Sequence, residues 1–343
     1  MIDLYGRTID YLRVSITDRC NLRCRYCLPG GEETVAADQE RYLNLEEVLR
    51  VCQAAERIGI HKFKITGGEP LVRQDCLELI RRLKELPETE AVTLTTNGVL
   101  LKRALPELKR LSIDGINVSL DTLKPERFSG IAGLCTDGRE TWKQVFEAVK
   151  EGAALGIPMK INCVPIRGLN EDEILDFVAL TRELPVDVRF IELMPIGAGK
   201  AFRGMSRLEL LEVIRNAWPE FQKTEEKRGN GPAVYGRIPG SQGCVGFIEA
   251  IHGKFCGSCN RLRLTSEGFL KPCLYYKKGV ELKTLLRKEA GNEKLEEALR
   301  QAVLQKPESH HFQETLDGSV HLFIRLFRCD HGKRNIVIYR PVF

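Results

Sequence analysis

Three cysteines lie within eight residues, at Cys20, Cys24 and Cys27, and form the first cysteine group. Cysteine thiolates bind [4Fe–4S] clusters with one thiolate for each iron. A loop with three cysteines therefore leaves one iron without a protein ligand and open to a molecule that takes part in the reaction. The spacing C-x3-C-x2-C indicates a site for chemistry.

A structural zinc site is the main alternative for these cysteines. Such a site is closed and tetrahedral, with four cysteines or three cysteines and a histidine as ligands. No fourth cysteine or histidine lies close in the sequence, since the nearest histidine is His61. The residue types therefore favour an iron–sulfur cluster.

The run Gly67-Gly68-Glu69-Pro70, called the glycine run below, is a further candidate. Two glycines after a strand allow the backbone to approach a ligand closely. In isolation such a run is more often a turn than a binding site. Its position one βα unit after the first cysteine group favours ligand binding.

The second cysteine group is Cys256, Cys259 and Cys273, with the spacing C-x2-C-x13-C. A lone C-x2-C is commonly half of a zinc ribbon, and Cys244 or His252 could supply a fourth ligand. The cysteines alone are therefore equally compatible with zinc and with iron–sulfur.

Two arginines, Arg261 and Arg263, alternate between the cysteines of this second group. An isolated arginine pair is more often a solvated surface feature. In a strand, however, both would share one face, and two guanidinium groups beside a metal site suit phosphate oxygens. This context favours an iron–sulfur site next to a phosphate-binding surface.

These residues need a scaffold that brings distant loops together. From residue 11 to about 195, short apolar runs alternate with longer segments of helical period, which is typical of βα units with a parallel sheet. Six units are too few for a closed eightfold barrel, so we expect an α/β fold with a partial (β/α)6 barrel. The predicted strands are 12–16, 63–66, 92–95, 116–120, 159–164 and 188–193, and the predicted helices are 75–86, 103–111, 141–155 and 171–183, with another from about 45 to 55.

In βα barrels the chemistry lies at the carboxyl ends of the strands. The unusual residues fall at those ends. The first cysteine group follows the first strand, the glycine run follows the second, Thr96-Asn97-Gly98 follows the third and Asp121 follows the fourth.

Composition restricts the class of protein. The chain has 343 residues, 43% of them hydrophobic and 29% charged, as in a folded soluble protein. The net charge of +5 without a long basic run argues against a nucleic-acid partner, and no stretch of about eighteen apolar residues suggests a membrane span. Without a signal peptide we expect a cytoplasmic protein whose twelve cysteines do not form disulfides. Six scattered cysteines are expected to be small buried apolar residues: Cys52, Cys76, Cys135, Cys163, Cys244 and Cys329.

Taken together, the cysteine groups, the glycine run and the arginine pair resemble the GTP 3',8-cyclase family of molybdenum-cofactor biosynthesis, within the radical S-adenosylmethionine (SAM) superfamily. The resemblance runs from about residue 5 to 312 and is most specific in residues 20–27, 64–73, 117–121, 190–194 and 245–273. It implies two [4Fe–4S] clusters, one in each cysteine group. The positions that match contacts to S-adenosyl-L-methionine are Tyr26, Gly68, Ser119 and Met194. Those that match contacts to GTP are Arg13, Lys64, Thr95, Lys160, Arg261 and Arg263.

The resemblance also implies the reaction. A 5'-deoxyadenosyl radical removes hydrogen from C3' of GTP, and the carbon radical attacks C8 of guanine. The product is (8S)-3',8-cyclo-7,8-dihydroguanosine 5'-triphosphate, in the first step of molybdopterin biosynthesis. The implied partners are an external electron donor, a second copy in a homodimer and a downstream cyclic pyranopterin monophosphate synthase.

Two positions depart from the family pattern. Lys64 stands where the family usually has an arginine, which keeps the charge but loses the bidentate fork. The chain ends Arg340-Pro341-Val342-Phe343, whereas the family chain usually ends in a Gly-Gly pair that enters the active site. Bulky residues do not follow the path of two glycines, so we expect impaired cyclisation. We divide the chain into a partial barrel (1–225), a region with the second cluster (226–312) and a divergent tail (313–343).

Three functions stay open from the sequence. The favoured one is the GTP cyclase, active or impaired by its altered end. A radical enzyme with an auxiliary cluster that acts on a peptide would not need Arg261 and Arg263. The third is a metal-binding module without enzymatic activity, such as a zinc-stabilised nucleic-acid binder.

Overall fold

The computed structural model describes residues 1–27, 39–226, 228–253, 255–288 and 291–312. The tail, residues 313–343, and the expected effect of its last residues on cyclisation lie outside the described residues, as does Cys329. Within the described ranges, no helix is both long enough and apolar enough to cross a membrane.

One curved sheet of twelve strands organises the described residues, in the order β12-β11-β10-β1-β2-β3-β4-β5-β6-β9-β8-β7. Strands β1 to β6 are parallel neighbours in chain order. The strands are β1 (Tyr11–Ser15), β2 (Lys62–Thr66), β3 (Ala91–Thr96), β4 (Gly115–Ser119), β5 (Met159–Cys163), β6 (Val186–Ile191), β7 (Gln222–Thr224), β8 (Val234–Arg237), β9 (Val245–Ile248), β10 (Arg261–Leu264), β11 (Phe269–Lys271) and β12 (Val280–Glu281).

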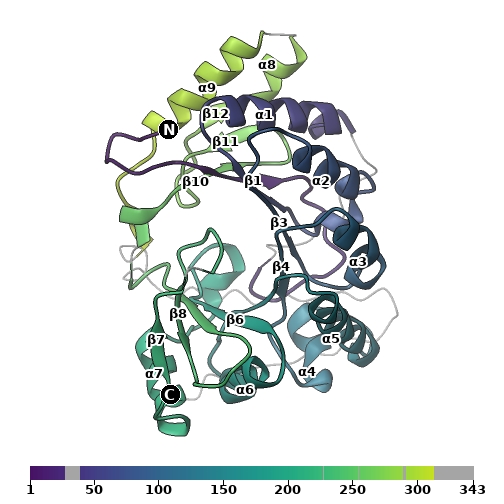
Figure 1. Cartoon of the computed structure of the whole chain (residues 1–343), viewed down its shortest axis with the longest axis vertical. Coiled ribbons are helices and arrows are strands. Elements are labelled where there is room, and N and C mark those ends of the chain that lie inside the picture. The colour runs from purple at the N-terminus through teal and green to yellow at the C-terminus, as the bar shows by residue number, and fades with distance from the viewer. Residues whose placement is uncertain (28–38, 227, 254, 289–290, 313–343) are drawn as a thin grey trace.

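Helices cover the convex side of the curved sheet (Figure 1). Helices α1 (Leu45–Arg57) and α7 (Arg207–Ala217) start at side-chain caps. For example, the Asn44 side chain accepts a bond of 2.9 Å from the Glu47 amide, and Glu47 accepts one of 2.8 Å from the Asn44 amide, which is a capping box. The helices are α1 (Leu45–Arg57), α2 (Cys76–Lys84), α3 (Leu101–Arg110), α4 (Pro125–Ala132), α5 (Arg139–Ala154), α6 (Ile174–Glu183), α7 (Arg207–Ala217), α8 (Lys283–Arg287) and α9 (Asn292–Leu304).

The sheet is a partial barrel, as the sequence predicted. Strand β6 pairs with β9 and β1 pairs with β10, both in parallel, so β1 and β6 do not close on each other. Residues 226–312 therefore build no sheet of their own but extend the first sheet at both edges. The domain boundary at residue 225 stays a prediction.

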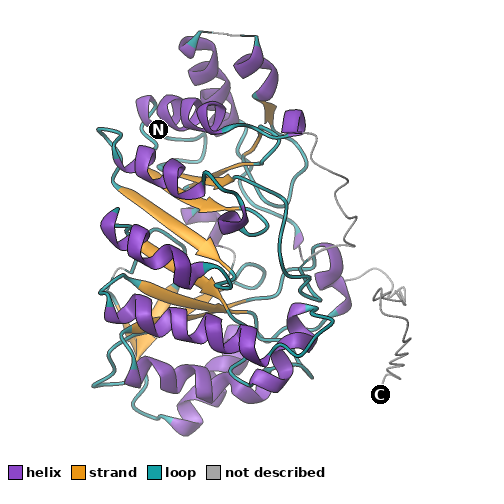
Figure 2. Cartoon of the chain, turned by 90° about the vertical axis from the view of Figure 1, so that its right-hand side faces the viewer, coloured by secondary structure: helices purple, strands orange, loops and turns teal. Residues whose placement is uncertain are grey.

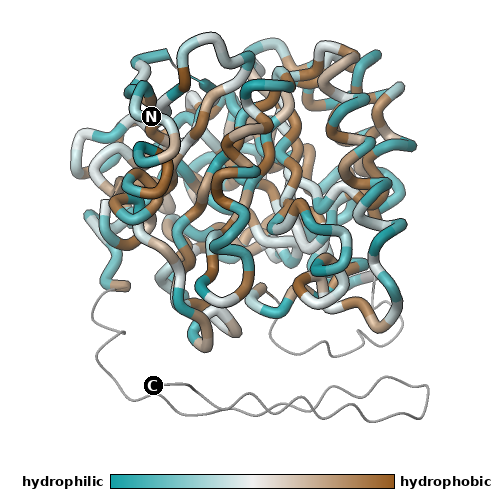
Figure 3. Tube along the Cα trace, turned by 90° about the horizontal axis from the view of Figure 1, so that it is seen from below, coloured by the Kyte–Doolittle hydropathy of each residue, from teal (hydrophilic) through white to brown (hydrophobic). Residues whose placement is uncertain are grey.

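Alternation along the strands separates an apolar face from a polar one. In β1 and β2, Leu12, Val14, Phe63 and Ile65 are fully buried in the core, while the residues between them face the concave side. Figure 3 shows that hydrophobic (brown) and hydrophilic (teal) stretches follow one another along much of the trace. Figure 2 shows loops gathered on the side to which the strand arrows point. The polar face and these loops position the candidate site.

Three expectations were wrong in detail. The connection from β4 to β5 contains α4, which was not predicted; its Pro125 at the first turn is a typical start signal. The helix predicted at 171–183 begins as a 3-10 turn, so α6 starts at Ile174. Cys135, in the loop after α4, is exposed and not buried. Burial was correct for Cys52, Cys76, Cys163 and Cys244.

Candidate functional site

The loop with the first cysteine group packs directly on the glycine run. The Gly68 amide donates to the Thr17 carbonyl at 2.8 Å, and the Glu69 amide donates to the Arg19 carbonyl at 2.8 Å. A Cβ atom on Gly68 would collide with the Arg19 carbonyl oxygen, and one on Gly67 would lie 2.5 Å from the Thr17 carbonyl oxygen. These glycines therefore permit a close approach to the cysteine loop. Contact of Gly68 with S-adenosyl-L-methionine stays a prediction.

Helix α4 supports the same loop from another side. The Arg23 amide donates to the Ala132 carbonyl at 2.9 Å, and the Arg25 amide donates to the Ile131 carbonyl at 3.1 Å. Gly133 ends α4 with φ of 68°, and a Cβ there would collide with the Arg23 carbonyl. Left-handed backbone and close contact both require glycine. Gly133 therefore allows α4 to pack against the loop that carries the first cysteine group. The sequence signal was the glycine after an apolar helix turn.

Glu69 joins the ends of two strands behind the first cysteine group. Its carboxylate is fully buried and accepts hydrogen bonds from Thr96 Oγ1 at 2.7 Å and from the Asn97 amide at 2.6 Å. Burial raises the pKa of Glu69, although these bonds oppose the shift. The side-chain amide of Asn97 donates a hydrogen bond from Nδ2 to Cys20 Sγ at 3.7 Å. Glu69 thus orients a hydrogen bond to a predicted cluster ligand.

Tyr26 ties the loop to β4 and β5. Its hydroxyl donates to Asp121 Oδ2 at 2.6 Å, and Asp121 Oδ1 accepts from the Val164 amide at 2.9 Å. Burial raises the pKa of Asp121 to about 6, despite these hydrogen bonds. Ser119 is exposed at the end of β4, and Met194 is half-buried after β6. The four predicted cofactor contacts thus lie at or beyond the carboxyl ends of strands, and their roles stay predictions.

The donors of the first group suit a cationic cluster. Burial raises the pKa of the Cys24 and Cys27 thiols, and the Asp121 carboxylate and the neighbouring thiols raise it further. A positive partner, which iron supplies, favours deprotonation of Cys24 and Cys27. Across the described ranges, no three histidine, cysteine or acidic side chains converge on a single metal ion. In a [4Fe–4S] cluster each thiolate binds a different iron.

A row of cations crosses the concave face of the sheet. Arg13 in β1 lies opposite Lys64 in β2 and opposite Arg263 in β10. Burial lowers the pKa of Lys64 and of Arg263, and neighbouring cations lower both further. The buried Nε of Arg13 has no hydrogen-bond partner in the described part of the chain. Since like charges placed opposite each other are unfavourable, this face suits a polyanion.

The remaining predicted substrate residues lie on the same face but are partly engaged. Thr95 pairs in register with Asn117. Lys160 forms an ion pair of 2.7 Å with Asp187, which is buried. Sequence reasoning missed Arg189, whose Nε donates to Asn162 Oδ1 at 2.9 Å and whose charge lowers the pKa of Lys64. Two charged residues inside the apolar run of β6 were the signal for it.

The second cysteine group is assembled from two segments. Cys256 belongs to a 3-10 turn (Phe255–Ser258), the Cys259 amide donates to the Cys256 carbonyl at 3.1 Å, and Cys273 follows β11. Burial opposes ionisation of Cys259, but the charges of Arg261 and Lys306 outweigh it and lower its pKa to about 7. Arg261 also lies 4.7 Å from the centre of the Phe255 ring.

The proposed fourth ligands for zinc do not join the second cysteine group. Cys244 is buried directly before β9, which is a neighbour of β6, whereas the second cysteine group flanks β10 and β11 beyond β1. The His252 ring is hydrogen-bonded to Glu192. The three cysteines therefore match the open donor set of an iron–sulfur cluster better than a closed zinc site.

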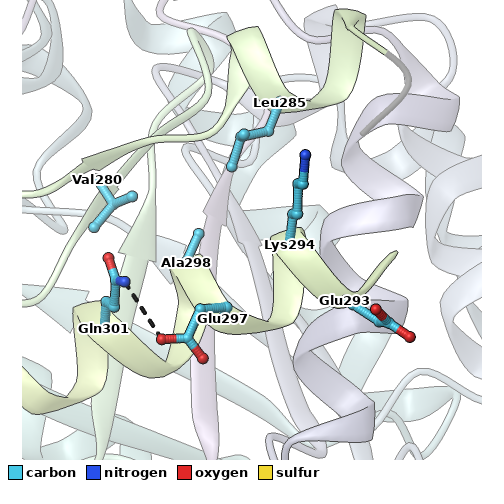
Figure 4. Close-up of a pocket in the computed structure, with 7 residues that line it drawn as sticks. All are labelled: Val280, Leu285, Glu293, Lys294, Glu297, Ala298 and Gln301. Carbon is cyan, nitrogen blue, oxygen red and sulfur yellow. Dashed lines mark hydrogen bonds between the residues drawn. The ribbon is translucent and has the colours of Figure 1, made fainter. Parts of the chain in front are cut away.

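A surface pocket of about 430 Å³ lies between β12, α8 and α9 (Figure 4). Its lining includes Val280, Leu285 and Gln301 but no cysteine and none of the predicted binding residues. The pocket is thus separate from the candidate site.

Comparisons with known proteins agree with this geometry. Residues 14–181 match the radical SAM superfamily, and residues 186–312 match the family Molybdenum Cofactor Synthesis C. The chain is 42% identical to a GTP 3',8-cyclase of Clostridium perfringens, over 91% of this chain and 95% of that protein. It is 44% identical to a GTP 3',8-cyclase of Heliobacterium modesticaldum, over 91% of this chain and 94% of that protein. It is also 42% identical to human molybdenum cofactor biosynthesis protein 1, over 90% of this chain and 48% of that longer protein.

Solved structures support the fold. Streptococcus suis SuiB bound to S-adenosylmethionine superposes with a TM-score of 0.59 at 17% identity, covering 83% of this chain and 64% of that one. At this identity the likeness concerns the fold alone. The identities above, over nine tenths of the sequence, decide the family: the chain belongs to the GTP 3',8-cyclase family of the radical SAM superfamily.

Proposed function

We propose that this chain converts GTP into (8S)-3',8-cyclo-7,8-dihydroguanosine 5'-triphosphate, the first step of molybdopterin biosynthesis. The observation that carries the proposal is the row Arg263, Arg13 and Lys64 beside the two cysteine groups, in a chain 42–44% identical to GTP 3',8-cyclases. A triphosphate supplies the negative charge that this row lacks.

The proposal assigns the cofactors by their donors. The first cysteine group holds a [4Fe–4S] cluster that binds S-adenosyl-L-methionine, and the second group holds another [4Fe–4S] cluster near the base. When bound, the first cluster and S-adenosyl-L-methionine supply the radical that abstracts hydrogen from C3' of GTP. An external electron donor and a downstream cyclic pyranopterin monophosphate synthase belong to the same proposal, as does a homodimer.

The chain's own residues bind and orient the substrate. Arg13, Lys64 and Arg263 bind the triphosphate through charge-assisted hydrogen bonds, which fixes one end of the nucleotide. Arg189 is held by Asn162 and Asn117 on the same face, where it adds positive charge without needing to move. Fixing the triphosphate restrains the rest of the nucleotide, and this positioning is the main contribution of the protein to a radical reaction.

The test is anaerobic turnover of GTP deuterated at C3', with S-adenosyl-L-methionine and a strong reductant. We expect deuterium in the 5'-deoxyadenosine and a cyclised guanosine triphosphate as product. ATP serves as the control nucleotide, and Lys84→Met as the control variant, because Lys84 pairs with Asp114 at the end of α2, away from the strands' carboxyl ends. Formation of 5'-deoxyadenosine without deuterium transfer would contradict the proposal and would favour another substrate, such as a peptide.

A further inference from the structure

Residues 306–310, Lys-Pro-Glu-Ser-His, have no part in the reaction described above, yet they lie against the second cysteine group. They follow α9, and Lys306 is only 3% exposed. We call them the C-terminal strap. A buried ammonium group is costly unless its charge and its hydrogen bonds are satisfied, so the partners of Lys306 are informative.

The Lys306 ammonium joins two segments of the second site. It donates to the Arg261 carbonyl at 2.8 Å and to the Pro272 carbonyl at 2.8 Å. Burial lowers the pKa of Lys306, and the charge of a Cys259 thiolate opposes that shift. Arg261 begins β10 and Pro272 directly precedes Cys273. One side chain therefore links both segments that carry the cysteines, and the charge that offsets the ammonium comes from a cysteine thiolate.

The rest of the strap is fastened to the same site. Arg7 donates to the Cys256 carbonyl at 2.8 Å, to the Glu308 carbonyl at 2.9 Å and to the Pro307 carbonyl at 2.7 Å. Asp3 holds the Arg7 guanidinium at 2.6 Å, and both side chains of this pair are buried. Arg7 thus joins the strap to the backbone of Cys256, and Lys306 joins it to the segments that carry Cys259 and Cys273.

We propose that Lys306 is a positioning residue of the second cluster, which fixes the segment of Cys259 relative to the segment of Cys273 and stabilises the reduced cluster through its buried positive charge. This inference rests on the proposed function, in which the second cysteine group holds a [4Fe–4S] cluster. The reduction potential of such a cluster depends on nearby charge and on hydrogen bonds to its sulfurs. A buried cation next to the cluster ligands favours the more negative, reduced state, so its removal lowers the potential.

The experiment uses the full chain with Cys20, Cys24 and Cys27 all changed to alanine, so that the second cluster is the only one present. In this parent, Lys306→Met removes the donors and the charge at similar length, and Lys306→Gln removes the charge but keeps an N–H donor. Lys84→Met is the matched control. Iron and sulfide are counted, and the reduction potential is measured by a titration followed by electron paramagnetic resonance.

We expect a shift to a more negative potential for Lys306→Met, a smaller shift in the same direction for Lys306→Gln, and none for Lys84→Met. If Lys306→Met does not fold or does not retain the cluster, the potential of Lys306→Gln decides. An unchanged potential in the lysine variants that retain iron overturns the inference and leaves the proposed function intact. A parent that binds no iron contradicts the proposed second cluster, and the inference fails with it; these two failures are distinguished by the parent alone.

Discussion

The two cysteine groups reach similar donor sets by different means. The first is one loop of eight residues, held by backbone contacts so close that Gly68 and Gly133 have no room for a Cβ atom. The second combines a 3-10 turn, the end of β11 and the C-terminal strap, held by the buried cations Arg7 and Lys306. One site is built by steric fit between backbones, the other by charged side chains that join distant segments.

This difference predicts how each site fails. A site formed by close backbone contact is sensitive to added volume, because the neighbouring backbone cannot move aside cheaply. A site formed by buried cations is sensitive to loss of charge, because the partners are left unpaired. Comparing equivalent substitutions in the two cysteine groups therefore shows whether each site is stabilised by steric fit or by buried charge.

The largest expected effect comes from removing the cysteines themselves. Changing Cys20, Cys24 and Cys27 together to alanine should remove about four of roughly eight irons per chain and abolish cleavage of S-adenosyl-L-methionine. The matched change at the second group should remove a similar amount of iron but leave some uncoupled cleavage, with no cyclised product. Iron analysis and chromatography of 5'-deoxyadenosine measure both. Loss of all iron in either variant would show that the two sites are not independent.

The next effect tests steric support. Gly68→Ala places a methyl group against the Arg19 carbonyl, so we expect the free energy of unfolding to fall by about 1–3 kcal/mol and the first cluster to be lost preferentially. Gly257→Ala, between Cys256 and Cys259, is the control, because a Cβ there meets nothing within 4 Å. Denaturant unfolding and iron content of the two variants are compared. Equal effects at both glycines would remove the distinction between the sites.

Sequence predicted the first site better than the second. The local spacing of Cys20, Cys24 and Cys27 and the glycine run were recognisable, and the partial barrel followed from the alternating pattern. Helix α4 was missed because a short segment with modest periodicity gives a weak signal. The contacts of Arg7 with residues 256, 307 and 308 span 249, 300 and 301 positions of the chain, and no local pattern encodes contacts of that separation.

The structure adds a second reason for the glycine run. Gly67 and Gly68 approach the backbone of residues 17–19 closely, which the sequence did not indicate, while the expected contact of Gly68 with S-adenosyl-L-methionine stays a prediction. A glycine pair in a sequence indicates a close approach to the backbone, but it does not identify the approaching group as a ligand or as another segment of the chain. Similarly, the alternation of Arg261 and Arg263 predicted a shared face, but only the structure shows that Arg261 is stacked on Phe255 beside Cys259.

The third effect concerns the triphosphate, at the boundary of the second site. Arg263 lies in β10 between the cysteines of that group and opposite Arg13. A charge-assisted hydrogen bond contributes roughly 1.5–3 kcal/mol, so Arg263→Ala should weaken GTP binding about tenfold or more. Calorimetry with GTP and with guanosine makes the comparison, and guanosine should lose far less. Equal weakening of both ligands would show that Arg263 does not bind phosphate.

The smallest effect concerns Lys64. This residue belongs to the cation row and lies in β2, three residues before the glycine run. Burial and the charges of Arg189 and Arg13 lower its pKa well below the ordinary value of 10.5. The ligand-free protein therefore binds fewer protons at Lys64 than the unfolded chain between these two pKa values. Stability of the ligand-free protein should accordingly rise with pH in that window as far as this group is concerned, because the unfolded state holds the extra proton.

GTP affinity should show the opposite trend. A bound triphosphate favours the protonated amine and raises its pKa again, so binding takes up a proton once the pH exceeds the lowered pKa. Affinity then falls with rising pH, by at most about tenfold per pH unit because one proton is involved. Lys64→Arg is the matched variant, since a guanidinium stays protonated throughout, and its affinity profile should be flatter. Calorimetry in buffers of different ionisation enthalpy measures the proton uptake directly. An identical uptake in both proteins would show that Lys64 is already protonated in the ligand-free protein and that GTP binding does not change its protonation state.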